Sequence, residues 1–141
     1  MVKVKAIMKK ELIAVKPEVT VTEACKILVS KKIGSILVCE KDVPYGIVTE
    51  KDVMYKVLAR ELDPKKVLVK DIMSQPLVTV GEDDEVGEAA DLMAAKSIRR
   101  LGVINKQGKL MGIITARDIM KFVGEAERFE ILRKLAQRDR F

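Results

Sequence analysis

The sequence contains no histidine and no tryptophan, and aromatic residues make up only 4% of its 141 residues. Histidine is the usual general base of enzymes and the commonest side-chain ligand of metals. Its absence argues against many catalytic and metal sites, so we expect a chain that is not an enzyme and has no metal site. Because 48% of the residues are apolar and few of these are aromatic, the core is expected to be aliphatic.

Cysteine is also scarce, with Cys25 and Cys39 as the two examples. Cys25 falls in a helical pattern and Cys39 in a strand pattern, without metal-ligand spacing, so both are interpreted as buried apolar residues. No apolar run approaches the roughly 20 residues of a membrane-spanning helix. The opening MVKVKAIMKK is too charged for the apolar part of a signal peptide. These features predict a cytoplasmic protein.

The net charge is +6, from 27 basic and 21 acidic residues that are interspersed along the chain. Such a mixture is typical of a soluble surface and favours anionic partners only slightly. Nucleic-acid binding is one interpretation of this charge. It is disfavoured because the basic residues form no single stripe and few aromatic side chains are present to stack on bases.

One unit occurs twice in the chain. VKAIM at 4–8 corresponds to VKDIM at 69–73, an offset of 65 residues. GIVTEKDVM at 46–54 corresponds to GIITARDIM at 112–120, an offset of 66. The chain is therefore interpreted as an internal duplication, which predicts a repeated architecture.

Local patterns predict the elements of each copy. In the first copy, residues 12–15, 35–39 and 45–49 are short β-prone runs. The last two are predicted to form a hairpin. A helix is predicted from Thr20, where Glu23 has the spacing of a capping box. A second helix follows the third strand. The order is β-α-β-β-α, and the second copy repeats it.

The predicted fold class is α/β, with two tandem β-α-β-β-α repeats. A sheet of three short strands cannot bury both of its faces alone, so we expect the repeats to pack with pseudo-two-fold symmetry through their small sheets. The predicted domains are a first repeat at 1–60, a connector with the second repeat at 61–123, and a charged tail at 124–141. Apolar residues at helical spacing in the tail predict a helix that packs on its own domain, on a dimer mate or on another partner. A basic arm is the alternative interpretation of the tail.

The stretches GIVTEKD and GIITARD place an acid three residues after a threonine, as Asp52 after Thr49 and Asp118 after Thr115. In one interpretation this is an ordinary helix start, in which the threonine hydroxyl accepts from the backbone amide of the acid. In the other, each helix start belongs to a nucleotide pocket. The threonine and the helix N-terminus would then face a phosphate, and the aspartate would bind the ribose.

Three neighbouring features favour the pocket. Lys51 and Arg117 occupy the second helical position, where the helix dipole disfavours a cation unless an anion is bound nearby. Gly46 and Gly112 interrupt strands of large aliphatic residues, which often marks close approach by a ligand or by another backbone. The acid is Asp in both copies, and a short carboxylate suits two adjacent hydroxyls such as a ribose diol. The two cations would neutralise the phosphate.

The second copy adds Arg99 and Arg100 where the first copy has Gly34 and Ser35. The pair precedes a predicted strand, and arginine suits bidentate contact with phosphate. The alternative is two solvated surface arginines. If the pair binds phosphate, the two copies form unequal sites, and the first has the weaker phosphate contact.

The repeat resembles the CBS (cystathionine beta-synthase) domain, which occurs in tandem pairs called Bateman modules. The resemblance rests on the repeated β-α-β-β-α unit, on DIM at 71–73, on VKP at 15–17 and on the two Gly-x-x-Thr-x-x-Asp stretches. It covers residues 4–123. The second copy departs from the family pattern at Gly102, where the family often has proline.

The resemblance implies a regulatory module that binds an adenosine-containing ligand (AMP, ADP, ATP or S-adenosylmethionine) in clefts between the copies. By this analogy, Asp52 and Asp118 hold the ribose, and Thr49 and Thr115 hold a phosphate. The residues implied to flank adenine are the backbone around Ala14, Val15, Thr79 and Val80, together with Leu37 and Gly102.

The resemblance also implies a disc-like homodimer without a catalytic cofactor, which signals to a separate enzyme or transporter. Ligand binding would shift a conformation that this partner recognises. A structural scaffold for dimerisation, with vestigial pockets, is the alternative function.

Overall fold

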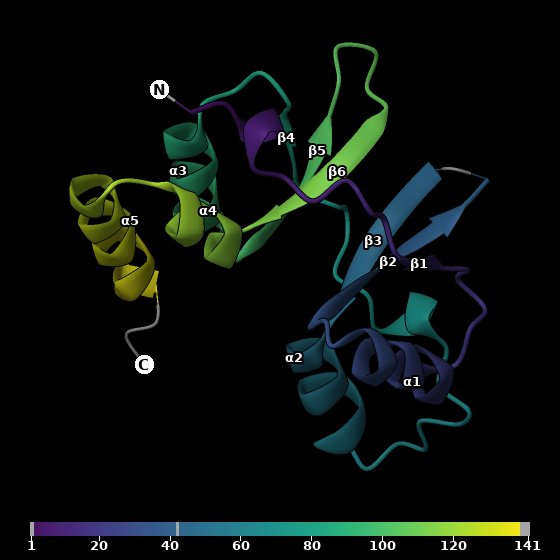
Figure 1. The fold of residues 1–141 in the computed structure, drawn as a ribbon. Helices are drawn as coiled ribbons and strands as arrows, with labels where there is room; N and C mark the ends of the chain where they lie inside the picture. Colours follow the sequence, from purple (N-terminus) through teal and green to yellow (C-terminus); the bar gives the residue numbers. More distant parts are fainter. Residues whose placement is uncertain (1, 42, 139–141) are drawn as a thin grey trace. The chain divides into compact units, whose positions relative to one another are not determined.

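A computed structural model of the protein describes residues 2–41 and 43–138 (Figure 1). These residues form two compact units, each with its own three-stranded sheet. The first-repeat unit comprises Ile13–Leu77. The second-repeat unit combines the residues up to Leu12 with those from Val78 onward.

The first-repeat unit follows the predicted order of strands and helices. Its strands lie in the order β1-β2-β3, with β1 parallel and β3 antiparallel to β2. Helix α2 runs directly into a π-helical turn, η2, so that the two form one continuous helical segment. In chain order the elements are β1 (Ala14–Val15), α1 (Val21–Lys31), β2 (Ser35–Glu40), β3 (Val43–Thr49), α2 (Glu50–Val53), η2 (Met54–Leu58) and the short helix η3 (Val69–Asp71).

The second-repeat unit has the same order, with the sheet β4-β5-β6 and one additional helix at its end. Strand β4 is parallel and β6 antiparallel to β5. The predicted α/β class is therefore confirmed. The elements are η1 (Val4–Ala6), β4 (Thr79–Gly81), α3 (Val86–Lys96), β5 (Arg100–Ile104), β6 (Leu110–Thr115), α4 (Ala116–Phe122) and α5 (Glu125–Arg138).

Each unit has its own aliphatic core, as the composition predicts. In the first-repeat unit, Ile36 and Val38 of β2 and Val48 of β3 lie in one buried cluster with Val21 and Leu28 of α1. Residues of β5, β6, α3 and α4 form the corresponding cluster of the second-repeat unit. Helices therefore cover one face of each sheet.

The two cysteines are less enclosed than predicted. Cys25 on α1 and Cys39 on β2 are half-buried, and Cys25 packs against the first-repeat core. This partial burial raises the pKa of the Cys25 thiol above its usual range.

The short segment that opens each sequence copy packs on the core of the unit formed by the other copy. Val4 and Ile7 belong to the second-repeat core, whereas Val69 and Ile72 belong to the first-repeat core. We call residues 4–9 and 69–74 the opening segments. The predicted division near residue 60 follows the sequence copies, whereas packing divides the chain after Leu12 and again after Leu77.

Helix α5 lies in the tail and packs beside α3 (Figure 1). Its residues Ile131 and Leu135 are buried in the second-repeat core. Of the three partners considered for the tail helix, its own domain is the one that these contacts show. Across residues 2–41 and 43–138, no helix is both long enough and apolar enough to cross a membrane.

Candidate functional site

Three predicted ligand residues of the first copy lie on the sheet face opposite its core. Leu37 of β2 pairs with Ala14 of β1, and Ser35 pairs with Thr49 of β3. Residues two apart in a strand point to the same face. Ala14, Leu37 and Thr49 therefore share one face, whereas Ile36 points into the core.

The second copy repeats this arrangement. Gly102 of β5 pairs with Thr79 of β4, and Arg100 pairs with Thr115 of β6. By the same alternation, these four residues share the sheet face opposite the core. The sheet thus brings predicted adenine and phosphate contacts together within each unit.

Val15 and Val80 have their side chains in the two cores. Only their backbone is therefore available to line a site on the opposite face. The resemblance implies backbone contacts at these two positions, and their contact with adenine stays a prediction.

Thr49 and Asp52 form a capping box at the start of α2. Thr49 Oγ1 accepts a hydrogen bond from the Asp52 amide at 3.2 Å, and Asp52 Oδ2 accepts one from the Thr49 amide at 2.9 Å. Thr115 and Asp118 repeat the pattern at 3.1 and 3.0 Å at the start of α4. Asp52 is 6% exposed and Asp118 4% exposed. The helix-start interpretation is therefore correct as a description of the local structure.

Asp52 has two further partners that were not among the predicted site residues. Ser74 Oγ donates to Asp52 Oδ1 at 3.0 Å, and Lys56 Nζ lies 2.9 Å from the same oxygen. Lys56 also donates to the Ile72 carbonyl at 2.8 Å. The spacing of Asp52 and Lys56 is i,i+4, so a search for helical ion pairs could have found it. No local pattern identifies Ser74.

Asp118 also has a lysine beside it. Lys9 Nζ lies 3.6 Å from Asp118 Oδ1. Lys9 in the first copy is equivalent to Ser74 in the second, by the offset of 65. Lys56 is equivalent to Phe122, by the offset of 66. Each buried carboxylate thus has a lysine partner, from the helix in the first copy and from the opening segment in the second.

Gly46 and Gly112 are required by the backbone of the opening segments. A Cβ on Gly46 would lie 2.6 Å from the Ser74 carbonyl oxygen, and one on Gly112 would lie 2.5 Å from the Lys9 carbonyl oxygen. The segments are held there by backbone hydrogen bonds, such as those from Ser74 to Ile47 and from Lys9 to Ile113, both 2.8 Å. Of the two predicted reasons for these glycines, a neighbouring backbone is the one observed.

Lys51 and Arg117, the predicted phosphate cations, both have exposed side chains. Lys51 Nζ lies 5.4 Å from the centre of the Tyr55 ring. A cation over an aromatic face is attracted to it. The attraction to the Tyr55 ring therefore offsets part of the unfavourable interaction between Lys51 and the helix dipole, even without a bound anion.

Arg99 and Arg100 lie next to the start of α4. Arg100 is half-buried in β5 opposite Thr115, and Arg99 is exposed. The Arg99 carbonyl accepts a hydrogen bond from the Ala116 amide at 2.9 Å. Gly34 does the same for Glu50 in the first copy, at 3.1 Å. The structure thus brings both arginines close to the predicted phosphate position of the second copy.

Comparison with curated proteins finds a close relative of undetermined function. An uncharacterised protein of Methanopyrus kandleri is 42% identical over 121 residues, which are 85% of this chain and 62% of that protein. This chain therefore spans less than two thirds of that relative.

Solved structures with similar folds include several proteins named for CBS domains. A hexameric CBS-CP12 protein from bloom-forming cyanobacteria is 37% identical with a TM-score of 0.80, covering 90% of this chain and 74% of that one. The CBS domain protein of Pyrobaculum aerophilum in complex with AMP is 27% identical with a TM-score of 0.78, covering 96% of this chain and 99% of that one.

The family model of the CBS domain matches the chain twice, at residues 4–59 and 69–125. The two matches follow the duplication in the sequence and span most of the chain. They also include both capping boxes and both opening segments. The protein belongs to the CBS domain family and contains two CBS domains in tandem.

Proposed function

We propose that this CBS pair is a regulatory module that binds an adenosine-containing ligand, with AMP, ADP, ATP and S-adenosylmethionine as the candidates. The observation that supports the proposal most is the AMP complex of the Pyrobaculum aerophilum protein, whose fold matches nearly the whole chain. In both copies of this chain, a buried aspartate and a threonine hydroxyl lie at the edge of the same sheet face.

In this proposal, Asp52 and Asp118 accept hydrogen bonds from the ribose diol, and each such bond to a carboxylate contributes roughly 1.5–3 kcal/mol. Thr49 and Thr115 contact phosphate. The basic side chains proposed to contact it are Lys51, Arg117, Arg99 and Arg100. At the first copy, a ribose hydroxyl has to share or displace the Ser74 and Lys56 contacts of Asp52. We therefore propose weaker binding at the first copy than at the second.

The complete capping boxes favour a second candidate, a structural scaffold. They account for both threonines and both aspartates without any ligand. The two candidates differ in what a charge-removing substitution does. A scaffold loses only stability, namely that of the cap, on the order of 1 kcal/mol, and that of the lysine pair, whereas a sensor also loses ligand affinity.

The test is calorimetric titration of the four ligands against the wild type, Asp52→Asn and Asp118→Asn. Asparagine keeps an oxygen that can accept from the cap amide but removes the charge. We expect a loss of at least tenfold in affinity at the altered site, about 1.4 kcal/mol. Asp84→Asn is the matched control, because Asp84 Oδ2 accepts from the Gly81 amide at 2.8 Å in a loop outside the predicted site.

Binding no tighter than about 1 mM for all four ligands contradicts the sensor and supports the scaffold. Equal affinities in the wild type and in both aspartate variants show that ligand binds elsewhere. Mass spectrometry of small molecules released from the purified protein identifies the ligand directly.

We further propose that the module forms a homodimer and signals to a separate enzyme or transporter through a ligand-dependent conformational change. The hexameric CBS-CP12 protein supports association of such modules. Sedimentation of the full chain at several concentrations tests the homodimer independently of any ligand.

A further inference from the structure

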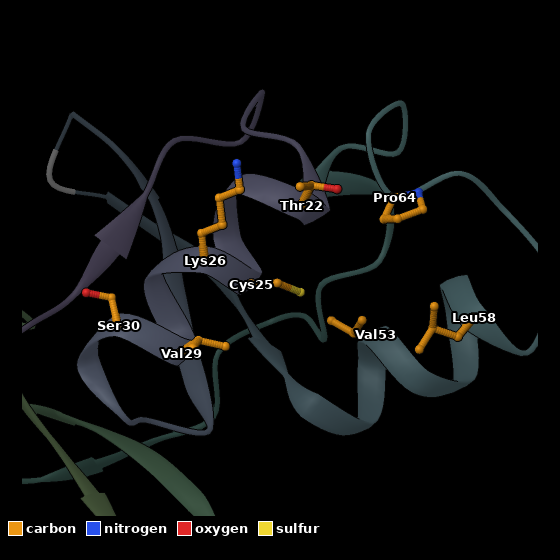
Figure 2. A pocket seen from close by; sticks show the side chains of 8 residues that line it. All are labelled: Thr22, Cys25, Lys26, Val29, Ser30, Val53, Leu58 and Pro64. Carbon is orange, nitrogen blue, oxygen red and sulfur yellow. The ribbon is translucent and has the colours of Figure 1, made fainter.

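An apolar groove of about 510 Å³ lies on the helical face of the first-repeat unit (Figure 2). Helices cover the core face of this sheet, so the groove is separate from the predicted nucleotide site on the opposite face. Val29 and Leu58 at the groove are 78% and 60% exposed, and apolar side chains gathered in one exposed patch mark an interaction site. The lining residues are Thr22, Cys25, Lys26, Val29, Ser30, Val53, Leu58 and Pro64.

The equivalent surface of the second-repeat unit is covered by α5. Ala90 and Ile119, the equivalents of Cys25 and Val53, are fully buried there, whereas Cys25 and Val53 are half-buried. Ile131 and Leu135 of α5 join the same core cluster as these residues. The internal duplication thus shows what this kind of surface binds, namely an amphipathic helix.

Charge distinguishes the two surfaces. Asp91 forms an ion pair with Lys134 of α5. The equivalent of Asp91 in the first copy is Lys26, which lines the open groove. A helix that docks on the first-repeat surface therefore has to present an acid, not a lysine, near this position.

Helix α5 carries a second apolar stripe on its exposed side. Phe129, Leu132 and Ala136 recur at helical spacing and are exposed, with Phe129 at 69% and Leu132 at 52%. Glu125, four residues before Phe129, begins this stripe and is also exposed. The buried stripe of the same helix contains Ile131 and Leu135. Helix α5 is therefore apolar on two sides.

We propose that the groove of the first-repeat unit binds the exposed stripe of α5 from a second copy of this chain. The stripe offers large apolar side chains and an acid, and the groove offers an apolar floor and Lys26. Each copy has one groove and one stripe, so reciprocal binding closes a symmetric dimer and buries both surfaces. The assignment rests on the proposed homodimer and states which surfaces form it.

The first test compares Leu132→Lys with Glu130→Lys by equilibrium sedimentation of the full chain. Both variants introduce lysine on exposed α5 positions, but only Leu132 belongs to the stripe. We expect Leu132→Lys to weaken dimerisation at least about tenfold and Glu130→Lys to leave it nearly unchanged. Circular dichroism should show the same helix content in both variants as in the wild type.

A monomeric wild type would overturn both the homodimer and this assignment. A stable dimer that Leu132→Lys leaves intact would overturn the assignment alone. These two failures are therefore distinguishable.

Native Cys25 in the groove provides a second test by disulfide cross-linking. In a Cys39→Ser background, Leu132→Cys should give a reducible covalent dimer on oxidation, and adding Cys25→Ser should abolish it. Glu130→Cys is the control position. Because burial raises the pKa of the Cys25 thiol, the oxidation is run at alkaline pH. A disulfide formed within one chain, or none at all, contradicts docking between copies.

Discussion

At the residue scale, the two copies satisfy the same chemical requirement with different side chains. Each has a buried aspartate that needs a positive neighbour, since burial of an unpaired charge is costly. Lys56 reaches Asp52 from the same helical segment, whereas Lys9 reaches Asp118 from the opening segment. A residue-by-residue comparison of the copies does not reveal this, because the two lysines are not at equivalent positions.

The requirement for glycine at positions 46 and 112 also depends on individual atomic contacts. We expect Gly46→Ala to lower the free energy of unfolding by roughly 1–3 kcal/mol, since the new Cβ would overlap the backbone of the opening segment. Gly112→Ala should act in the same way. Urea unfolding measures both.

Gly87→Ala is the matched control. Gly87 lies in α3 and has nothing within 4 Å of a new Cβ. Alanine there should be neutral or stabilising by up to about 1 kcal/mol. Equal effects at Gly46 and Gly87 would show that the opening segment does not approach the strand as described.

At the scale of elements, local patterns were sufficient to predict the order of strands and helices. The Thr20–Glu23 spacing predicts the start of α1, and Thr20 Oγ1 accepts from the Glu23 amide at 3.2 Å. The equivalent position before α3 is Glu85, which makes no side-chain cap hydrogen bond. Glu85 nevertheless has nearly the same backbone angles as Thr20, φ −80° and ψ 149° against φ −74° and ψ 157°.

The Glu88 amide already donates to the Glu85 carbonyl at 3.0 Å, so a threonine hydroxyl at position 85 would add a second acceptor. We therefore expect Glu85→Thr to stabilise the second-repeat unit by up to about 1 kcal/mol. Thermal unfolding measures the gain. Glu85→Val, similar in shape but without the hydroxyl, should give none. A gain from valine as large as that from threonine would contradict a capping mechanism.

At the scale of the whole molecule, the opening segments join the sequence of one copy to the core of the other. Ile72 belongs by sequence to the second copy but packs in the first-repeat core, and Ile7 shows the reverse. Each core therefore depends on residues from both sequence copies.

Ile72→Ala should destabilise the first-repeat unit by roughly 2–5 kcal/mol, the usual cost of removing this much buried side chain. Hydrogen exchange should accelerate first in α1, whereas Ile7→Ala should accelerate exchange first in α3. The two substitutions are controls for each other. The opposite assignment, with Ile72→Ala acting first on α3, would show that each opening segment packs with its own sequence copy.

The sequence by itself determined the duplication, the order of elements, the aliphatic composition of the core and the threonine–aspartate helix starts. All of these depend on residues within a few positions of one another, or on repetition at a fixed offset. Local geometry and periodicity are therefore enough to predict them.

Only the tertiary structure decided why Gly46 is glycine, which groups surround Asp52, and which core each opening segment enters. Ser74 approaches Gly46 and Asp52 across more than twenty residues of chain, and Lys9 approaches Asp118 across more than a hundred. Contacts over such distances leave no periodic trace in one sequence, because they depend on how the folded segments pack.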